Sequence, residues 1–156
     1  SPGSGKTCAL PSVVDLLHRR FGTPQRLSQY AHIDPDYFLE RSFNSDNKYR
    51  DATNFCNHES LLTAVGQRRH ILFDHVGRDM ANTCGRCIFR FLEAGYRVFV
   101  CIVLAGYERC RDRVHRRFKE TGRDVPEVFL RGAFEALQTA IPEYIHRRAR
   151  LAEAVV

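Results

Sequence analysis

Long apolar runs, regularly spaced cysteines and internal repeats are all missing from this sequence of 156 residues. Without an apolar run as long as a bilayer is thick, the sequence predicts no transmembrane helix and no membrane partner. The six cysteines lack the dense, regular spacing of a secreted disulfide scaffold, so a reducing, cytoplasmic compartment is expected. No linker or low-complexity tract divides the chain, which suits a single domain over residues 1–156.

The charge of the chain favours anionic partners, because the formal net charge is +6. Nucleotides, sugar nucleotides and nucleic acids all qualify. Nucleic acid is the weakest of the three, since the basic residues are not interleaved with an aromatic platform on which bases could stack. The Cys84 and Cys87 pair has the spacing of zinc ligands, but no second pair follows, so no zinc site is predicted.

The first residues, SPGSGKT, resemble the end of a phosphate-binding loop, whose pattern G-x-x-x-x-G-K-[ST] would place its leading glycine just before Ser1. Such a loop opens a helix, because backbone N–H groups at a helix N-terminus converge on phosphate. A flexible terminus is the alternative, and the helical pattern that follows directly argues against it. The residues predicted to bind nucleotide are Pro2, Gly3, Ser4, Gly5, Lys6 and Thr7, with Lys6 at the β- and γ-phosphates and Thr7 on Mg²⁺.

Short apolar runs alternate with longer segments of helical period. This alternation predicts an α/β fold with a mainly parallel central sheet, as in the three-layer sandwich of P-loop NTPases. A phosphate-binding loop normally follows a strand, and the final LAEAVV resembles the start of another, so the sheet is expected to be truncated at both ends. Strands are expected at Ser28–Asp34, at His70–Asp74 and, centrally, at Tyr96–Leu104. Helices are expected up to Phe21 and at about Ala52–Val65, Met80–Ala94, Tyr107–Lys119 and Glu127–Ile145.

Carboxylates stand at the ends of two predicted strands, where an α/β sheet places its chemistry. Asp36 follows Asp34 and Pro35, and a kinase acting on a hydroxyl needs a carboxylate there to accept the proton. An Asp-Pro turn with a helix cap would explain the same residues. Asp74 follows Ile71-Leu72-Phe73 and has the position of a Walker B residue that orders Mg²⁺.

Basic residues crowd the segment from Arg109 to Arg123. Guanidinium groups on a mobile lid can stabilise the charge of a transferred phosphoryl group. Most of these residues are expected on a solvated helix face, because one face cannot bring all of them to one phosphate. Arg117 and Arg123 are the predicted phosphate ligands, since they flank the break at Thr121-Gly122.

These motifs together resemble the zeta toxin family of P-loop kinases over nearly the whole chain. Their order and spacing carry the resemblance more than any one of them. The matching elements are the loop Pro2–Thr7, the IDxDxF element Ile33–Phe38, the acid-x-x-Gly-Arg element Asp74–Arg78, Ala94-Gly95-Tyr96, and Arg117-Phe118 followed by Thr121–Pro126.

The resemblance implies transfer of the γ-phosphate of ATP or GTP, with Mg²⁺, to the 3′-hydroxyl of a UDP-N-acetylated amino sugar. It implies that Asp36 is the general base, that Lys6 is the P-loop lysine, and that Arg117 and Arg123 bind phosphate. Asp74 stands where the family usually has Glu, as a metal and substrate ligand. Glu59 and Arg78 fall near substrate-contact positions. Bacterial members are toxins paired with a neutralising protein, and this sequence does not reveal such an inhibitory partner.

Two other functions remain open from the residues alone. One is a P-loop kinase for another hydroxyl substrate, such as a nucleoside or a sugar acid. The other is a nucleotide-binding module without phosphoryl transfer. Convergence of Asp36 and Lys6 on one pocket would favour an enzyme, and room for a uridine diphosphate beside Asp36 would favour the sugar nucleotide.

Overall fold

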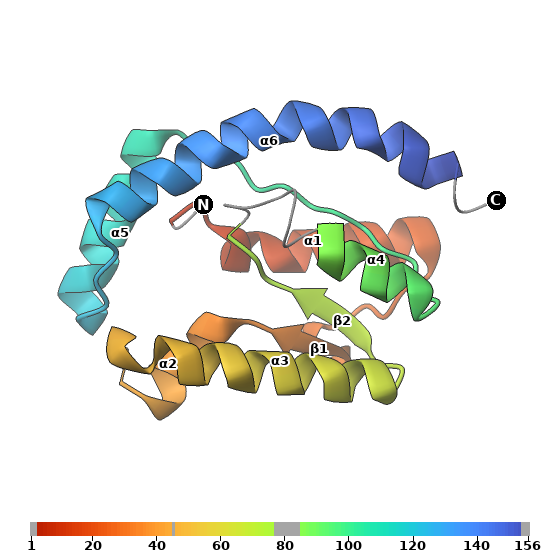
Figure 1. The fold of residues 1–156 in the computed structure, drawn as a ribbon, viewed down its shortest axis with the longest axis horizontal. Coiled ribbons are helices and arrows are strands. Elements are labelled where there is room, and N and C mark those ends of the chain that lie inside the picture. Colours follow the sequence, from red (N-terminus) through yellow and green to blue (C-terminus); the bar gives the residue numbers. More distant parts are fainter. Residues whose placement is uncertain (1–2, 45, 77–84, 154–156) are drawn as a thin grey trace.

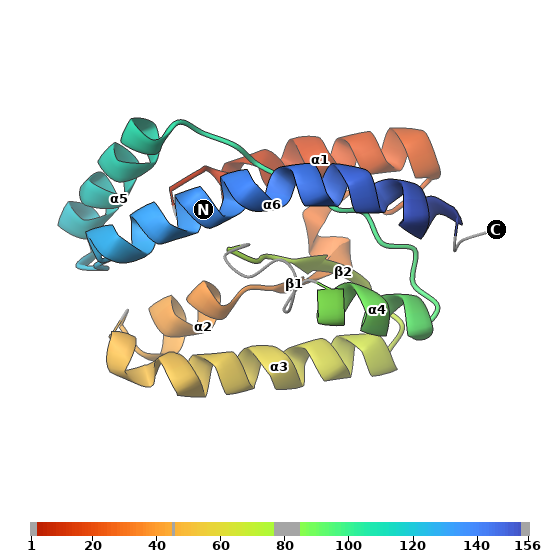
Figure 2. The same cartoon turned by 45° about the horizontal axis from the view of Figure 1, so that its top comes forward.

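The computed structural model describes residues 3–44, 46–76 and 85–153. Helices dominate, and they lie on both sides of a small parallel sheet. Figures 1 and 2 show α2 and α3 on one side of the two strands and α1 and α6 on the other. The elements are α1 (Lys6–Phe21), η1 (Leu27–Gln29), β1 (Tyr30–Ile33), α2 (Pro35–Ser42), η2 (Asn47–Tyr49), α3 (Arg50–Gly66), β2 (His70–Phe73), α4 (Gly85–Glu93), α5 (Tyr107–Thr121) and α6 (Glu127–Glu153).

The sheet pairs β1 with β2 in parallel, and Tyr30 lies opposite His70 while Ile33 lies opposite Phe73. Helix α3 is the crossover that a parallel pair requires. The backbone N–H of Asp74 donates to the carbonyl of Ile33 at 2.9 Å, so the pairing extends one residue beyond β2. The prediction of an α/β fold with parallel strands in these two segments is therefore confirmed, and both strands end at the same edge.

The predicted central strand at Tyr96–Leu104 is wrong for the part of the chain that the structure describes. This segment has no strand pairing, and the sheet described has two strands. It runs between α4 and α5 as an irregular segment (Figure 1). Phe99 in this segment contacts Phe21 of α1 with ring centroids 4.5 Å apart. A strand needs a neighbour for its backbone, and no described strand lies alongside. Helix α6 continues to Glu153, and the predicted strand start in the last residues of the chain lies outside the described residues.

The packing of α5 against α6 matters most for the site. Cys110, Val114 and Leu130 form a fully buried cluster between these helices. Leu39 of α2 and Val14 of α1 are buried as well. This packing holds α5 beside the N-terminus of α1, where the predicted phosphate-binding loop lies. Within the described ranges, no helix carries an apolar stretch long enough to cross a bilayer.

Candidate active site

The phosphate-binding loop enters α1 through two glycines with left-handed backbone. Gly3 has φ 71° and Gly5, the N-cap of α1, has φ 91°. A Cβ on Gly3 would lie 2.4 Å from the carbonyl oxygen of Cys110, closer than real atoms approach. Both the backbone conformation and the contact with α5 therefore require glycine at Gly3.

We expect Gly3→Ala to lower the free energy of unfolding by about 2 kcal/mol, because the new methyl group meets backbone and φ is positive. Gly132→Ala is the matched control. Gly132 lies inside α6 with open space around it, so alanine there should raise the free energy of unfolding by about 0.5–1 kcal/mol. Urea denaturation of both variants measures the effect, and equal changes in the two would contradict this account of the loop.

Arg113 of α5 holds the same loop from the other side. Its Nη1 donates to the carbonyl oxygens of Gly3 and Ser4, both at 3.1 Å. Sequence reasoning singled out Arg117 and Arg123 and placed Arg113 among the solvated residues. The sequence contained a signal for Arg113, because it lies four residues before Arg117 and so shares its helix face.

Lys6 and Asp74 meet at the carboxyl edge of the sheet, where Lys6 Nζ lies 3.5 Å from Asp74 Oδ1. Ligand atoms of His32, Asp34 and Asp74 all lie within 4.8 Å of one another. Carboxylate oxygens are the hard donors that Mg²⁺ prefers, and in the loop the Ser4 hydroxyl is buried without a hydrogen-bond partner among the described residues. The residues present therefore fit a nucleotide with Mg²⁺, with Thr7 following Lys6 in the first turn of α1.

Asp34 connects β1 to α2. Its side chain is the N-cap of α2 and accepts the backbone N–H of Asp36 at 2.9 Å. Burial raises the pKa of Asp34, and the nearby Asp74 carboxylate adds to the rise, although the hydrogen bond from Asp36 opposes it. The turn that sequence reasoning offered as an alternative is thus present, and it is this turn that orients Asp36.

The cap predicts a difference between two substitutions of Asp34. Asp34→Ala should lower the free energy of unfolding by about 1 kcal/mol, because the α2 N-terminus loses its acceptor, while Asp34→Asn keeps it. Since the folded-state pKa of Asp34 is raised, its ionisation opposes folding. The aspartate chain should therefore lose stability relative to Asp34→Asn as pH rises through that pKa. Denaturation of all three chains from pH 4 to 8 tests this, and a cap role is excluded if Ala and Asn behave alike.

Asp36 lies between two arginines. Arg50 Nη1 approaches Asp36 Oδ1 at 2.9 Å, and Arg123 Nη2 pairs with Asp36 Oδ2. Arg123 also donates from Nη1 to Glu40 Oε1 at 2.6 Å. Burial alone would raise the pKa of Asp36, but the hydrogen bonds and charges of Arg123, and then of Arg50, outweigh it and lower the pKa. Sequence reasoning missed Arg50 and Glu40.

Arg117 lies next to this group. Burial lowers its pKa and the charge of Arg123 lowers it further, while Asp36 and Glu40 act in the opposite direction. The Nε atoms of Arg117 and Arg123 are both buried, and neither has a hydrogen-bond partner among the described residues. Two buried guanidinium N–H groups without acceptors, on arginines whose charges act on each other, are groups that an anion would stabilise.

A comparison with protein families decides the relationship, because the model described as "Zeta toxin" matches residues 1–156. The chain belongs to the zeta toxin family. Membership indicates P-loop kinase-like chemistry with a nucleotide and a small-molecule substrate. No curated protein and no solved structure gives a match to the chain.

The remaining predicted site residues of this zeta toxin family member make no described contact with the residues around Lys6 and Asp36. Glu59 is exposed on α3, and its carbonyl accepts the hydroxyl of Thr63. Pro2 and Arg78 lie outside the described residues. Three basic residues of α5 are exposed, which agrees with the predicted solvated face: Arg109, Arg116 and Lys119.

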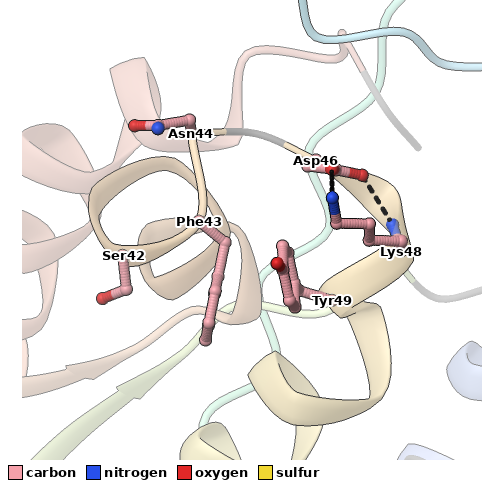
Figure 3. Close-up of a pocket in the computed structure, with 6 residues that line it drawn as sticks. All are labelled: Ser42, Phe43, Asn44, Asp46, Lys48 and Tyr49. Atoms are coloured by element: carbon pink, nitrogen blue, oxygen red, sulfur yellow. Dashed lines mark hydrogen bonds and ion pairs between the residues drawn. The ribbon is translucent and has the colours of Figure 1, made fainter.

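Two pockets of the zeta toxin fold lie away from Lys6 and Asp36. One, of about 340 Å³, is lined by residues 42–44, 46, 48 and 49. Figure 3 shows the rings of Phe43 and Tyr49 at this pocket, stacked with centroids 4.8 Å apart, and the Asp46–Lys48 ion pair beside them. The other, of about 510 Å³, lies between residues 103–106 and α6. The predicted site residues are thus linked by contacts rather than by either of these pockets.

Proposed function

We propose that this chain is a kinase that transfers the γ-phosphate of ATP or GTP to a hydroxyl group of a small molecule. The observation that carries the proposal is a series of neighbouring residues, joined by ion pairs, a hydrogen bond and the proximity of the Asp74 and Asp34 carboxylates. It runs from the Lys6–Asp74 ion pair, through Asp34, to Asp36 and Arg123. A cation for the phosphates, carboxylates for a metal, a proton acceptor and phosphate-binding arginines are thus gathered at one edge of the sheet.

Each group has a role in this reaction. Asp36 removes the proton as the acceptor oxygen forms its bond to the γ-phosphorus and the bond to the β–γ bridging oxygen breaks. Lys6, Arg117 and Arg123 balance the negative charge that spreads over the transferred phosphoryl group. Asp74 and Thr7 would hold Mg²⁺, which when bound neutralises phosphate charge. Arg113 binds the carbonyl oxygens of Gly3 and Ser4, and this leaves the N–H groups of the loop to face the phosphates.

For the acceptor we propose the 3′-hydroxyl of a UDP-N-acetylated amino sugar, with Glu59, Asp74 and Arg78 as its contacts. Membership of the zeta toxin family supports this choice. The net charge of +6 suits a diphosphate-containing acceptor as well as the nucleotide.

The test is incubation of the protein with Mg²⁺ and radiolabelled ATP or GTP in the presence of single acceptors: UDP-N-acetylglucosamine, N-acetylglucosamine, uridine or gluconate. We expect label on UDP-N-acetylglucosamine, at a position that NMR identifies as the 3′-oxygen. Label on another acceptor alone would keep the kinase and replace the substrate. Nucleotide binding without label on any hydroxyl compound would leave a binding module.

A further inference from the structure

Both oxygens of the Asp36 carboxylate are occupied by guanidinium groups. Arg50 Nη1 lies 2.9 Å from Oδ1, and Arg123 Nη2 pairs with Oδ2. A proton acceptor needs a free oxygen toward the attacking hydroxyl. In this arrangement each oxygen already accepts from one guanidinium group, so Asp36 is a weaker proton acceptor than a free carboxylate.

Of the two arginines that pair with Asp36, Arg123 is the one that another ligand can draw away. Its side chain is 6% exposed and is shared between Asp36 and Glu40, while its Nε stays without a partner among the described residues. Arg117 lies close enough for its charge to repel Arg123. The carboxylates of Asp36, Glu40 and Asp34 all act on Arg117 here, and the buried Nε groups of Arg117 and Arg123 are still without a partner among the described residues, so an added phosphate would supply the missing acceptors.

Arg50 differs from Arg123 because it is anchored within its own segment. It begins α3, and its Nη2 donates to Asn47 Oδ1 at 3.1 Å. Arg50 can therefore stay on Oδ1 and keep the Asp36 carboxylate oriented after Arg123 leaves Oδ2.

We propose that Asp36 and Glu40 form a latch for Arg123, and that the terminal phosphate of the bound nucleotide releases this latch and frees Oδ2 of the base. The inference rests on the proposed function and adds its regulation. The latch couples the two substrates: once the nucleotide has drawn Arg123 from its carboxylates, Oδ2 of Asp36 becomes the stronger proton acceptor for the acceptor hydroxyl. Glu40 is then a positioning residue whose effect is exerted through Arg123.

The latch predicts that removal of a carboxylate tightens nucleotide binding, because Arg123 no longer has to be withdrawn from it. Titration of the non-hydrolysable analogue AMP-PNP with Mg²⁺ should give a Kd about three- to fivefold lower for Glu40→Gln than for the parent. If Glu40→Gln damaged the structure, it would weaken AMP-PNP binding instead of tightening it. Asp46→Asn is the matched control: it removes the same charge from a residue that pairs with Lys48, and its Kd should equal that of the parent.

A double-mutant cycle separates the latch from a general loss of negative charge. In an Arg123→Ala background, Glu40→Gln should leave Kd unchanged, since the group that it releases is gone. Two results would overturn the latch: tighter binding by Glu40→Gln that persists in the Arg123→Ala background, or no tighter binding by Glu40→Gln in the chain that retains Arg123. Asp36→Asn provides a second release variant with the same expected dependence on Arg123. If the parent chain does not bind AMP-PNP, the proposed function falls as well; if it binds and Glu40→Gln has no effect, only the latch falls.

Discussion

Replacement of Asp36 by Asn should lower turnover by about 10²-fold or more, because the side chain keeps its size and loses the ability to accept a proton. Nucleotide affinity should not fall, since Asp36 does not contact the phosphates in the proposed reaction. The measurement is the rate of phosphate transfer to the acceptor, with AMP-PNP affinity determined in parallel. Asp51→Asn, an exposed carboxylate in the first turn of α3, is the control and should retain the parent rate.

The pH dependence gives an independent check on Asp36. Because Arg123 and Arg50 outweigh burial and lower its pKa, the carboxylate is ionised across the neutral range. The value of kcat/KM should therefore fall only as pH drops toward this lowered pKa, and not near pH 6–7. A parent-like rate in Asp36→Asn would make Asp36 a turn residue, and Asp34 or Asp74 would become the candidate base.

Replacement of Lys6 by Ala should weaken nucleotide binding at least about tenfold and reduce turnover by about 10²–10³-fold. Lys6 supplies the cation at the start of α1, and it is held 3.5 Å from Asp74 at the edge of the sheet. Its loss would leave Asp74, which is largely buried, without this partner. Fluorescence titration of a labelled nucleotide analogue measures affinity, and the transfer assay measures rate.

Lys48→Ala is the matched control for Lys6, because Lys48 also pairs with an aspartate but is exposed. Its partners are Asp46 and Tyr49, which are not part of the phosphate-binding loop. Lys48→Ala should change neither affinity nor rate. Equal affinities of the parent and Lys6→Ala chains would remove the phosphate-binding role of residues 3–7.

Local signals allowed most helices to be predicted. Helix α1 ends before Gly22 and α5 before Gly122, and both glycines adopt the left-handed conformation that stops a helix. Two parallel strands were predicted from short apolar runs that end in aspartate, at Ile33 and Phe73. These features depend on neighbouring residues in the sequence, and so the sequence contains them.

Contacts between distant segments could not be predicted in this way. The segment at residues 96–104 is apolar enough for a strand, but a strand also needs a partner, and composition does not supply one. Glu40 meets Arg123 across 83 residues of chain, and Arg50 reaches Asp36 across 14. The charges of these residues were visible, but their pairing depends on where α2, α3 and α5 lie in space.

The hold of Arg113 on the phosphate-binding loop has a consequence for the order in which the protein matures. The two hydrogen bonds join residues 110 and 109 positions apart, so the loop is made well before its support. During synthesis from the N-terminus, the loop cannot take this shape until α5 has left the ribosome and packed beside it. A nascent chain that ends before α5 would therefore carry the phosphate-binding sequence without its binding conformation, and nucleotide binding would begin only after α5 has been made.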